Sequence, residues 1–215
     1  MPGLLPITPE RIIAIALIIL ISFPVHEFSH ALAAYRLGDG TAKLFGRLTL
    51  NPVVHFDPLG AAFLVISSLV GRGIGWAKPT PVNTANLRYG SAGDAIVSFA
   101  GPASNLVLAA AVALPLRVIL NSDDLRFQVP AFAQDVMFNF IAINLGLFVF
   151  NLIPVPPLDG SSILLAALDP RTAYQVRPVL LQYGPIILLV LIFTGFASII
   201  LGPIIDALLT LLVGR

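Results

Sequence analysis

Two histidines four residues apart, with a glutamate directly after the first, lie at the end of a long apolar run. Residues 12–25 contain no charged side chain, and the His-Glu-x-x-His motif follows at His26, Glu27 and His30. Residues four apart share one face of a helix, so both imidazoles can reach a single metal ion. Glu27 is then placed to deprotonate a water molecule at that metal. Ionisable groups at membrane depth indicate a function, so we prefer this interpretation to a chance match on a soluble helix.

The composition predicts a membrane protein. The chain has 215 residues, of which 57% are hydrophobic and only 11% are charged, whereas about a quarter of the residues of a soluble domain are charged. The net charge of +1 argues against a nucleic-acid surface. Because there is no cysteine, a metal must be held by His, Asp or Glu. The histidines of the chain are His26, His30 and His55.

The distribution of apolar segments predicts an all-α polytopic protein with about four full spans and short re-entrant or half helices. The first helix is expected to begin at Pro9, with Thr8 as its cap, and to end near Arg36. Further long apolar segments cover residues 94–120, 130–153 and 184–213, and the last of these is long enough to tilt or to break at Pro203. Residues 61–70 and 158–168 are too short to cross alone. Partial alternation in residues 41–57 and 74–83 predicts a small β-strand element between the first helix and the next full span. We expect one domain over residues 1–215, with a catalytic core at about 10–168 and a C-terminal membrane segment at 184–213.

Charged residues predict the orientation. The segment between the first helix and the helix that starts near Asp94 carries Arg36, Lys43, Arg47, Arg72, Lys78 and Arg88. The positive-inside rule assigns these residues to the cytoplasm, provided that residues 61–70 enter the membrane and return. The end of the first helix, with its histidines, then lies on the same side as the end of the helix that closes at Ile153.

Asp159 is the best candidate for a third ligand, since catalytic zinc takes three protein ligands and leaves one position open. It follows Ile153 in the Pro-rich segment that ends at Gly160, at the depth of the histidines. The alternative is that Asp159 caps the helix that begins with Gly160. Asp57 and His55 compete for the role, but we expect Asp57 to cap a short helix and His55 to satisfy local hydrogen bonds.

The motifs together resemble those of the site-2 proteases, a family of intramembrane zinc metalloproteases. The resemblance rests on three motifs in the expected order: His26-Glu27-x-x-His30, Gly101-Pro102-x-x-Asn105, and Asn151-x-x-Pro154-x-Pro156-Pro157-Leu158-Asp159-Gly160. It implies that His26, His30 and Asp159 bind one Zn²⁺ per chain and that Glu27 is the catalytic base. It also implies that Asn105 helps to bind the substrate carbonyl or its oxyanion. The alternative for Asn105 is a structural contact between spans.

The resemblance also implies a compact form of the family. Residues 121–129 leave no room for the PDZ domain that many relatives carry. The expected activity is hydrolysis of peptide bonds in or near the transmembrane segments of other proteins, in the plasma membrane of a bacterium or archaeon. The active site would lie nearer the cytoplasmic side. Expected partners are transmembrane substrates and the lipid bilayer, with no nucleic acid and an open oligomeric state.

Two other functions remain open from the sequence alone. A metal-binding transporter can also use broken helices and polar groups at the middle of the membrane. A catalytically silent scaffold could bind membrane segments and keep the metal for structure only. The glutamate of the His-Glu-x-x-His motif favours the protease over both.

Overall fold

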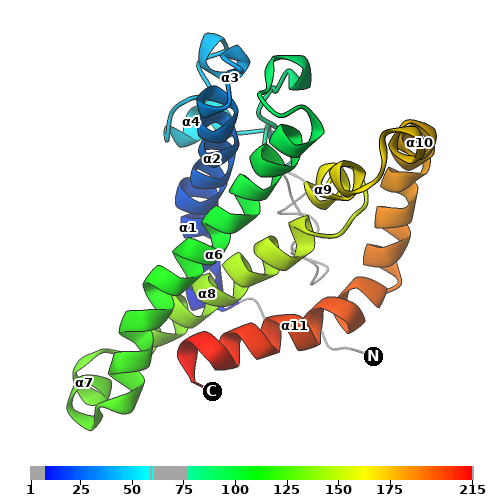
Figure 1. Ribbon diagram of the computed structural model, residues 1–215. Coiled ribbons are helices and arrows are strands. Elements are labelled where there is room, and N and C mark those ends of the chain that lie inside the picture. The colour runs from blue at the N-terminus through cyan, green and yellow to red at the C-terminus, as the bar shows by residue number, and fades with distance from the viewer. Residues whose placement is uncertain (1–7, 59, 61–76, 215) are drawn as a thin grey trace.

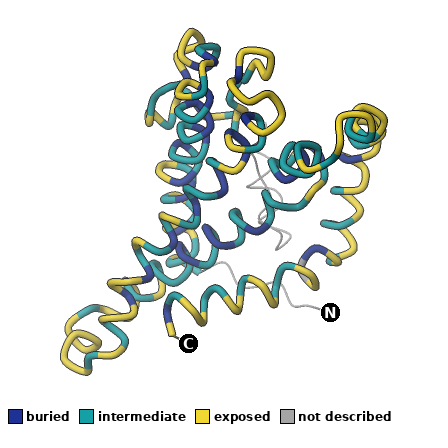
Figure 2. The backbone as a smooth tube through the Cα atoms, viewed as in Figure 1, coloured by how far each residue is buried: buried dark blue, intermediate teal, exposed yellow. Residues whose placement is uncertain are grey.

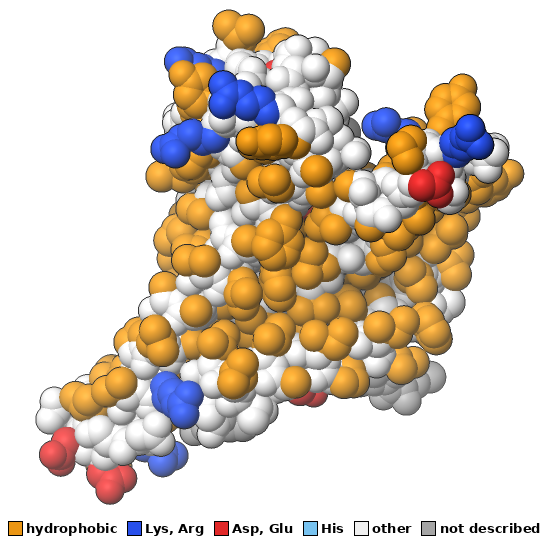
Figure 3. All heavy atoms as spheres, viewed as in Figure 1, with side chains coloured by type: hydrophobic (Ala, Val, Ile, Leu, Met, Phe, Trp, Pro, Cys, Tyr) orange, Lys and Arg blue, Asp and Glu red, His pale blue; other side chains and the backbone are white. Residues whose placement is uncertain are grey.

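The described residues of the computed structural model, 8–58, 60 and 77–214, form a bundle of helices without a β-strand (Figure 1). Within them, four helices are long and apolar enough to cross a membrane: Pro9–Arg36, Ser91–Asn121, Ala131–Asn151 and Pro170–Phe193. The described residues are therefore all-helical with four candidate spans, as predicted, but the fourth lies at Pro170–Phe193 and not at residues 184–213. Figure 3 shows apolar side chains over the middle of one face, with most charged side chains gathered around α3 and the start of α10 or around α7.

The first span has three parts: α1 (Pro9–Leu17), a π-helical turn η1 (Ile18–Ser22) and α2 (Phe23–Arg36). Thr8 caps α1 as predicted, because its hydroxyl accepts a hydrogen bond of 3.3 Å from the backbone N–H of Arg11. The π-helical turn ends directly before Phe23 and Pro24. Proline lacks an N–H and its ring clashes with the carbonyl four residues earlier. The wider turn accommodates Pro24 and lets the helix continue into the histidine motif.

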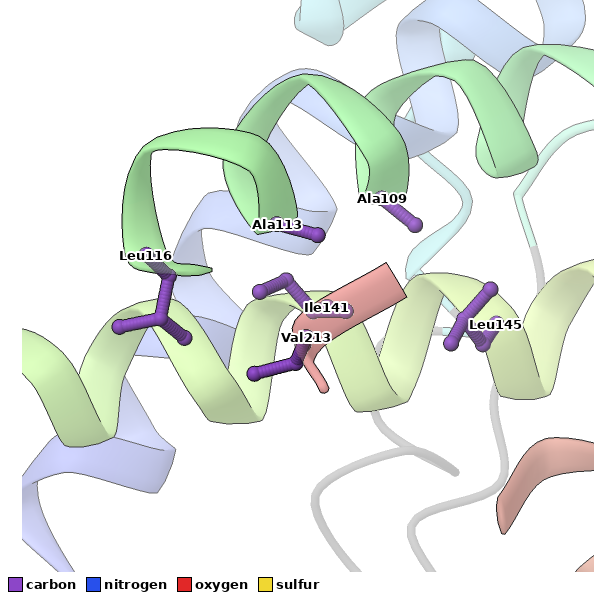
Figure 4. Close-up of a cluster of buried hydrophobic side chains, with 6 residues drawn as sticks. All are labelled: Ala109, Ala113, Leu116, Ile141, Leu145 and Val213. Carbon is purple, nitrogen blue, oxygen red and sulfur yellow. The ribbon is translucent and has the colours of Figure 1, made fainter. Parts of the chain in front are cut away.

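The core of the bundle lies between α6 (Ser91–Asn121) and α8 (Ala131–Asn151), which are joined by α7 (Asp123–Gln128). Alanines at 109 and 113 allow the two backbones to approach closely, as is common between membrane helices. The buried side chains of this core are Ala109, Ala113, Leu116, Ile141, Leu145 and Val213 (Figure 4). α2 packs against α6, and α1 packs against α8. Figure 2 shows the buried positions along these contacts.

The predicted β-strand element is wrong, because the described part of residues 41–57 and 74–83 contains no strand. Residues 41–57 instead contain two short helices, α3 (Thr41–Leu44) and α4 (Pro52–His55). Local side chains satisfy the backbone here: Asp39 accepts from the N–H of Thr41, and Asn51 accepts from the N–H of Val53. Such bonds compete with a strand ladder. Residues 77–83 have no regular structure, and the expected re-entrant segment 61–70 lies outside the described residues.

The C-terminal part consists of α9 (Gly160–Ala167), α10 (Pro170–Phe193) and α11 (Phe196–Val213). The apolar segment expected at residues 184–213 is divided between α10 and α11, because the chain breaks at Gly195, whose φ of 76° is left-handed. Pro203, the expected break, lies inside α11. α10 stands at the edge of the bundle in Figure 1. Only 6% of its 18-residue apolar stretch is buried inside the protein. α11 returns to pack against α8 and α6.

Candidate metal centre

Three of the predicted site residues converge. His26 and His30 come from α2, and Asp159 comes from the turn before α9. The two Nε2 atoms lie 3.0 Å apart, and each lies 3.4 Å from an oxygen of the Asp159 carboxylate. One ligand atom from each residue lies within 4.8 Å of the others. We call these three residues the ligand cluster.

The ligand cluster fits a zinc ion. Two ligands that bind a tetrahedral zinc at about 2.0–2.1 Å lie about 3.3–3.4 Å from one another, close to the spacing of 3.0–3.4 Å found here. Among the described residues, Oδ2 of Asp159 is buried and has no hydrogen-bond partner, which is costly unless a cation completes the site. Nδ1 of His30 lies 2.7 Å from the backbone carbonyl of Val97, so it carries the proton and leaves the Nε2 lone pair for a metal.

Asp159 does not cap α9, the alternative that the sequence left open. It occupies the N-cap position of α9, yet its side chain makes no capping hydrogen bond within the described structure. The carboxylate faces the histidines instead. Gly160 permits this turn, because a Cβ there would lie only 2.5 Å from the carbonyl oxygen of Ile153. The Pro-rich turn therefore brings the end of α8 and the start of α9 close together and directs Asp159 inward.

Gly101 of α6 lies directly against the ligand cluster. A Cβ at this position would lie 2.7 Å from Nε2 of His26 and closer still to Nε2 of His30. Real Cβ atoms do not approach other atoms this closely, so residue 101 must be a glycine in this arrangement. The sequence motif that contains Gly101 and Asn105 thus has a steric reason for its first residue.

Glu27 is buried and is held by a loop that the sequence did not connect to it. The backbone N–H of Thr80 donates to Oε2 of Glu27 over 2.8 Å, and the Thr80 hydroxyl donates to the Glu27 carbonyl over 3.1 Å. The same loop is fixed a little earlier, where the N–H of Lys78 donates to the carbonyl of His55. No sequence motif could identify Thr80, because its role depends on a contact with a residue 53 positions away.

Asn105 lies behind His26 and is fully buried. Its Oδ1 is 2.6 Å from Nδ1 of His26, and its Nδ2 donates to Oδ1 of Asn144 over 3.1 Å. Both ends of the amide are therefore engaged by protein groups. The predicted role of Asn105 as a direct oxyanion donor stays a prediction, and sequence reasoning did not distinguish Asn144 from the other asparagines of α8.

His55 and Asp57 lie outside the ligand cluster. Nε2 of His55 donates to the carbonyl of Thr49 over 2.8 Å, as expected for a histidine in a local structural role. Oδ1 of Asp57 accepts from the N–H of Gly60 over 3.0 Å, and the helix that Asp57 was expected to cap lies outside the described residues. His55 thus makes a local hydrogen bond of the kind that the sequence suggested, and the capping role of Asp57 stays a prediction.

Comparison with known proteins identifies relatives along most of the chain. The profile of peptidase family M50 matches residues 127–192, a segment that includes Asp159. The chain is 39% identical over 192 residues to YwhC of Bacillus subtilis (strain 168), covering 88% of this chain and 84% of that protein. It is 36% identical to Rip2 of Mycolicibacterium smegmatis and 32% identical to Rip2 of Mycobacterium tuberculosis (strain ATCC 25618 / H37Rv).

Each of these relatives is named as a putative zinc metalloprotease. The alignments cover 81% and 80% of this chain for the two mycobacterial proteins, but only 64% and 63% of their own lengths. The chain therefore spans less than two thirds of these longer relatives. No solved structure matches the chain significantly.

Proposed function

Because this chain belongs to peptidase family M50, the site-2 protease family of zinc metalloproteases, we propose that it hydrolyses peptide bonds in the membrane-spanning segments of other proteins. The observation that carries this proposal is the convergence of His26, His30 and Asp159 at the spacing of zinc ligands. The four apolar spans support cleavage within a bilayer.

The ligand cluster would hold the zinc ion. His26 and His30 would each bind through Nε2, and Asp159 would bind through a carboxylate oxygen. When bound, zinc supplies Lewis-acid activation of the attacking water and of the scissile carbonyl. The tight packing against Gly101 would keep the two imidazoles in place. Three protein ligands leave room for the reacting groups, as in other catalytic zinc sites.

Glu27 would move the proton. It follows the first ligand on α2, and its Oε2 is fixed by the N–H of Thr80. We assign to Glu27 the removal of a proton from the attacking water and its delivery to the amide nitrogen that leaves. The two contacts from Thr80 would hold this carboxylate and its helical turn in one position during both steps. Thr80 is therefore a positioning residue in this proposal.

The substrate would be a transmembrane helix that unwinds locally, because the carbonyls of an intact helix are hydrogen-bonded and shielded. We propose that the protein works in the bacterial plasma membrane with the ligand cluster nearer the cytoplasmic side. Arg36 at the end of α2 and Lys43 in α3 are basic residues that support this orientation. The names of the relatives point to proteolysis, and none of the three describes a transporter or a scaffold.

The decisive experiment compares the parent with Glu27→Gln in detergent or liposomes, using a panel of single-span membrane proteins and measuring bound zinc in every sample. We expect equal zinc in both proteins and cleavage only by the parent, because the amide cannot accept the proton. Glu10→Gln is a matched control, since Glu10 is the other glutamate of the chain and lies in the first turn of α1. Retained cleavage by Glu27→Gln, or a parent without zinc, would refute the proposed mechanism.

A further inference from the structure

A chain of hydrogen bonds runs from the ligand cluster into the contact between α6 and α8. Nδ1 of His26 lies 2.6 Å from Oδ1 of Asn105, and Nδ2 of Asn105 donates to Oδ1 of Asn144 over 3.1 Å. Nδ2 of Asn144 then donates to the backbone carbonyl of Phe140 over 2.9 Å. Both asparagines are 0% exposed. Two buried amides in an apolar bundle are costly unless each polar atom has a partner, and here every link supplies one.

The last hydrogen bond of this series fixes which atom donates and which accepts in the other two. The carbonyl of Phe140 can only accept a hydrogen bond, so Asn144 must turn its NH₂ group toward it and its Oδ1 toward Asn105. Asn105 must therefore donate to Asn144 and turn its own Oδ1 toward His26. An amide oxygen also only accepts, so Nδ1 of His26 must carry the proton.

We propose that Asn105 and Asn144 form a relay that holds His26 as the Nδ1-protonated tautomer, with the lone pair of Nε2 aimed at the zinc position. This inference rests on the proposed function and deepens it by adding two positioning residues for the first ligand. It also gives Asn105 a role that acts through His26 rather than on the substrate. Hydrogen bonds to the second nitrogen of a ligating histidine commonly set its tautomer and ring orientation.

His30 provides an internal reference for this proposal. Its Nδ1 is also protonated, but it donates directly to the backbone carbonyl of Val97 and not to a side chain. No side-chain substitution in the relay removes that carbonyl. Variants of Asn105 or Asn144 should therefore alter His26 and leave His30 unchanged.

The test uses ¹⁵N-histidine labelling, which is favourable because the chain contains only three histidines. The protein is purified through a tag without histidine, and the tautomer of each ring is read from its ¹⁵N shifts with and without zinc. Zinc affinity is measured on the same samples. We expect Nδ1 of His26 to be protonated in the parent in both states.

Four variants separate the links. Asn105→Leu removes the acceptor for His26, so we expect a mixture of tautomers and zinc affinity lower by about 10- to 100-fold. Asn105→Asp keeps an acceptor and should restore the Nδ1-protonated form. Asn144→Leu leaves the Asn105 amide free to rotate by 180° and should give an intermediate loss of zinc affinity.

Asn139→Leu is the matched control. The Asn139 amide donates to the carbonyl four residues earlier, as Asn144 does, but lies outside the relay.

The outcomes distinguish this inference from the proposed function. Unchanged His30 and His55 signals would show that a variant remains folded. If His26 is protonated at Nε2 in the parent, or if Asn105→Leu and Asn144→Leu leave its tautomer and zinc affinity unchanged, the relay is refuted even when substrate is cleaved. If the relay behaves as expected but no membrane substrate is cleaved, only the proposed proteolysis fails.

Discussion

Position 101 tolerates no side chain at all in the described arrangement. A Cβ there would meet Nε2 of both His26 and His30. At Gly146 of α8, by contrast, nothing lies within 4 Å of an added Cβ. Two helical glycines of the same protein thus differ completely in the space around them.

We predict that Gly101→Ala loses zinc, while Gly146→Ala retains it. Alanine favours a helix over glycine by about 1 kcal/mol, so neither change should weaken the helix itself. The loss at position 101 would come from displacement of the two imidazoles. Zinc content of the purified proteins, measured by elemental analysis together with their helical circular dichroism, tests this. Stoichiometric zinc in Gly101→Ala would contradict the geometry of the ligand cluster.

Asp39 is a second residue whose surroundings decide its behaviour. Burial raises the pKa of this carboxyl group, but hydrogen bonds from the Thr41 hydroxyl, the Asn83 N–H, the Asn86 amide and the Thr41 N–H outweigh it, so the pKa is lowered overall. Asp39 therefore links the end of α2 to the loop before α6. Its ionised form stabilises the folded protein.

The stabilisation by Asp39 should depend on pH in one direction. It is fully present above the unfolded pKa of about 3.9 and is lost as the pH falls through the lower folded pKa. Asp39→Asn should thus unfold at a lower temperature than the parent at about pH 6, and the difference should shrink toward about pH 3. Thermal unfolding of both proteins across this range tests the sign. A difference that grows on acidification would refute it.

At the scale of elements, α10 makes a close contact with the Pro-rich turn that carries Asp159. A Cβ at Gly184 would lie 2.8 Å from Cδ and 3.0 Å from the carbonyl oxygen of Pro156, three residues before Asp159. Gly184 is the buried residue of α10 within the described structure. Because so little of α10 is buried, the packing of α10 against the rest of the bundle should depend strongly on this contact.

We predict that Gly184→Leu moves α10 away from the turn and makes its ends more accessible to added protease. The bound zinc should remain, because α10 contributes no residue to the ligand cluster. Gly202→Leu in α11 is the control, since nothing lies within 4 Å of a Cβ at that position. Limited proteolysis and zinc content, measured side by side, would decide. Equal proteolysis of both variants would exclude a role for this contact.

The elements also indicate which features could be read from the sequence. Thr8 and Pro9 mark a helix start through local chemistry, and the prediction was correct. The predicted strands failed because the backbone N–H groups of Thr41 and Val53, which a ladder would have needed, donate locally to the side chains of Asp39 and Asn51. The sequence favoured a break at Pro203 over Gly195, because proline is the stronger helix breaker, yet proline can be tolerated inside a membrane helix, and Pro203 lies inside α11.

The residues of the candidate site also fall into those that the sequence could predict and those that it could not. The sequence predicted His26, His30 and Asp159 as a ligand set because metal chemistry restricts the ligand types, the motif spacing places the histidines, and the Pro-rich segment places Asp159 at their depth. The structure brings these three residues together. It could not identify Thr80 or Asn144, whose contacts join segments that only the folded bundle brings together. The few residue types that can bind a metal make the ligands predictable from sequence. The residues that position those ligands can have many types, and only the three-dimensional fold shows where they lie.

At the scale of the whole molecule, the orientation in the membrane can be tested directly, because the chain has no cysteine. Lys43 and Asp124 are both exposed and lie at opposite ends of the bundle, on α3 and α7. We predict that Lys43→Cys reacts with an impermeant maleimide only after the cell membrane is opened, whereas Asp124→Cys reacts in intact cells. The reverse pattern would place the ligand cluster nearer the outer side.

The ligand cluster joins two parts of the chain that are far apart in sequence, α2 and the turn before α9. In a protein without cysteine, a bound metal ion is the nearest equivalent of a disulfide. It closes a loop of about 130 residues, and closing so long a loop restricts the unfolded chain strongly. We therefore expect zinc to act as the cross-link of this bundle, so that chelation lowers its resistance to unfolding as well as its activity.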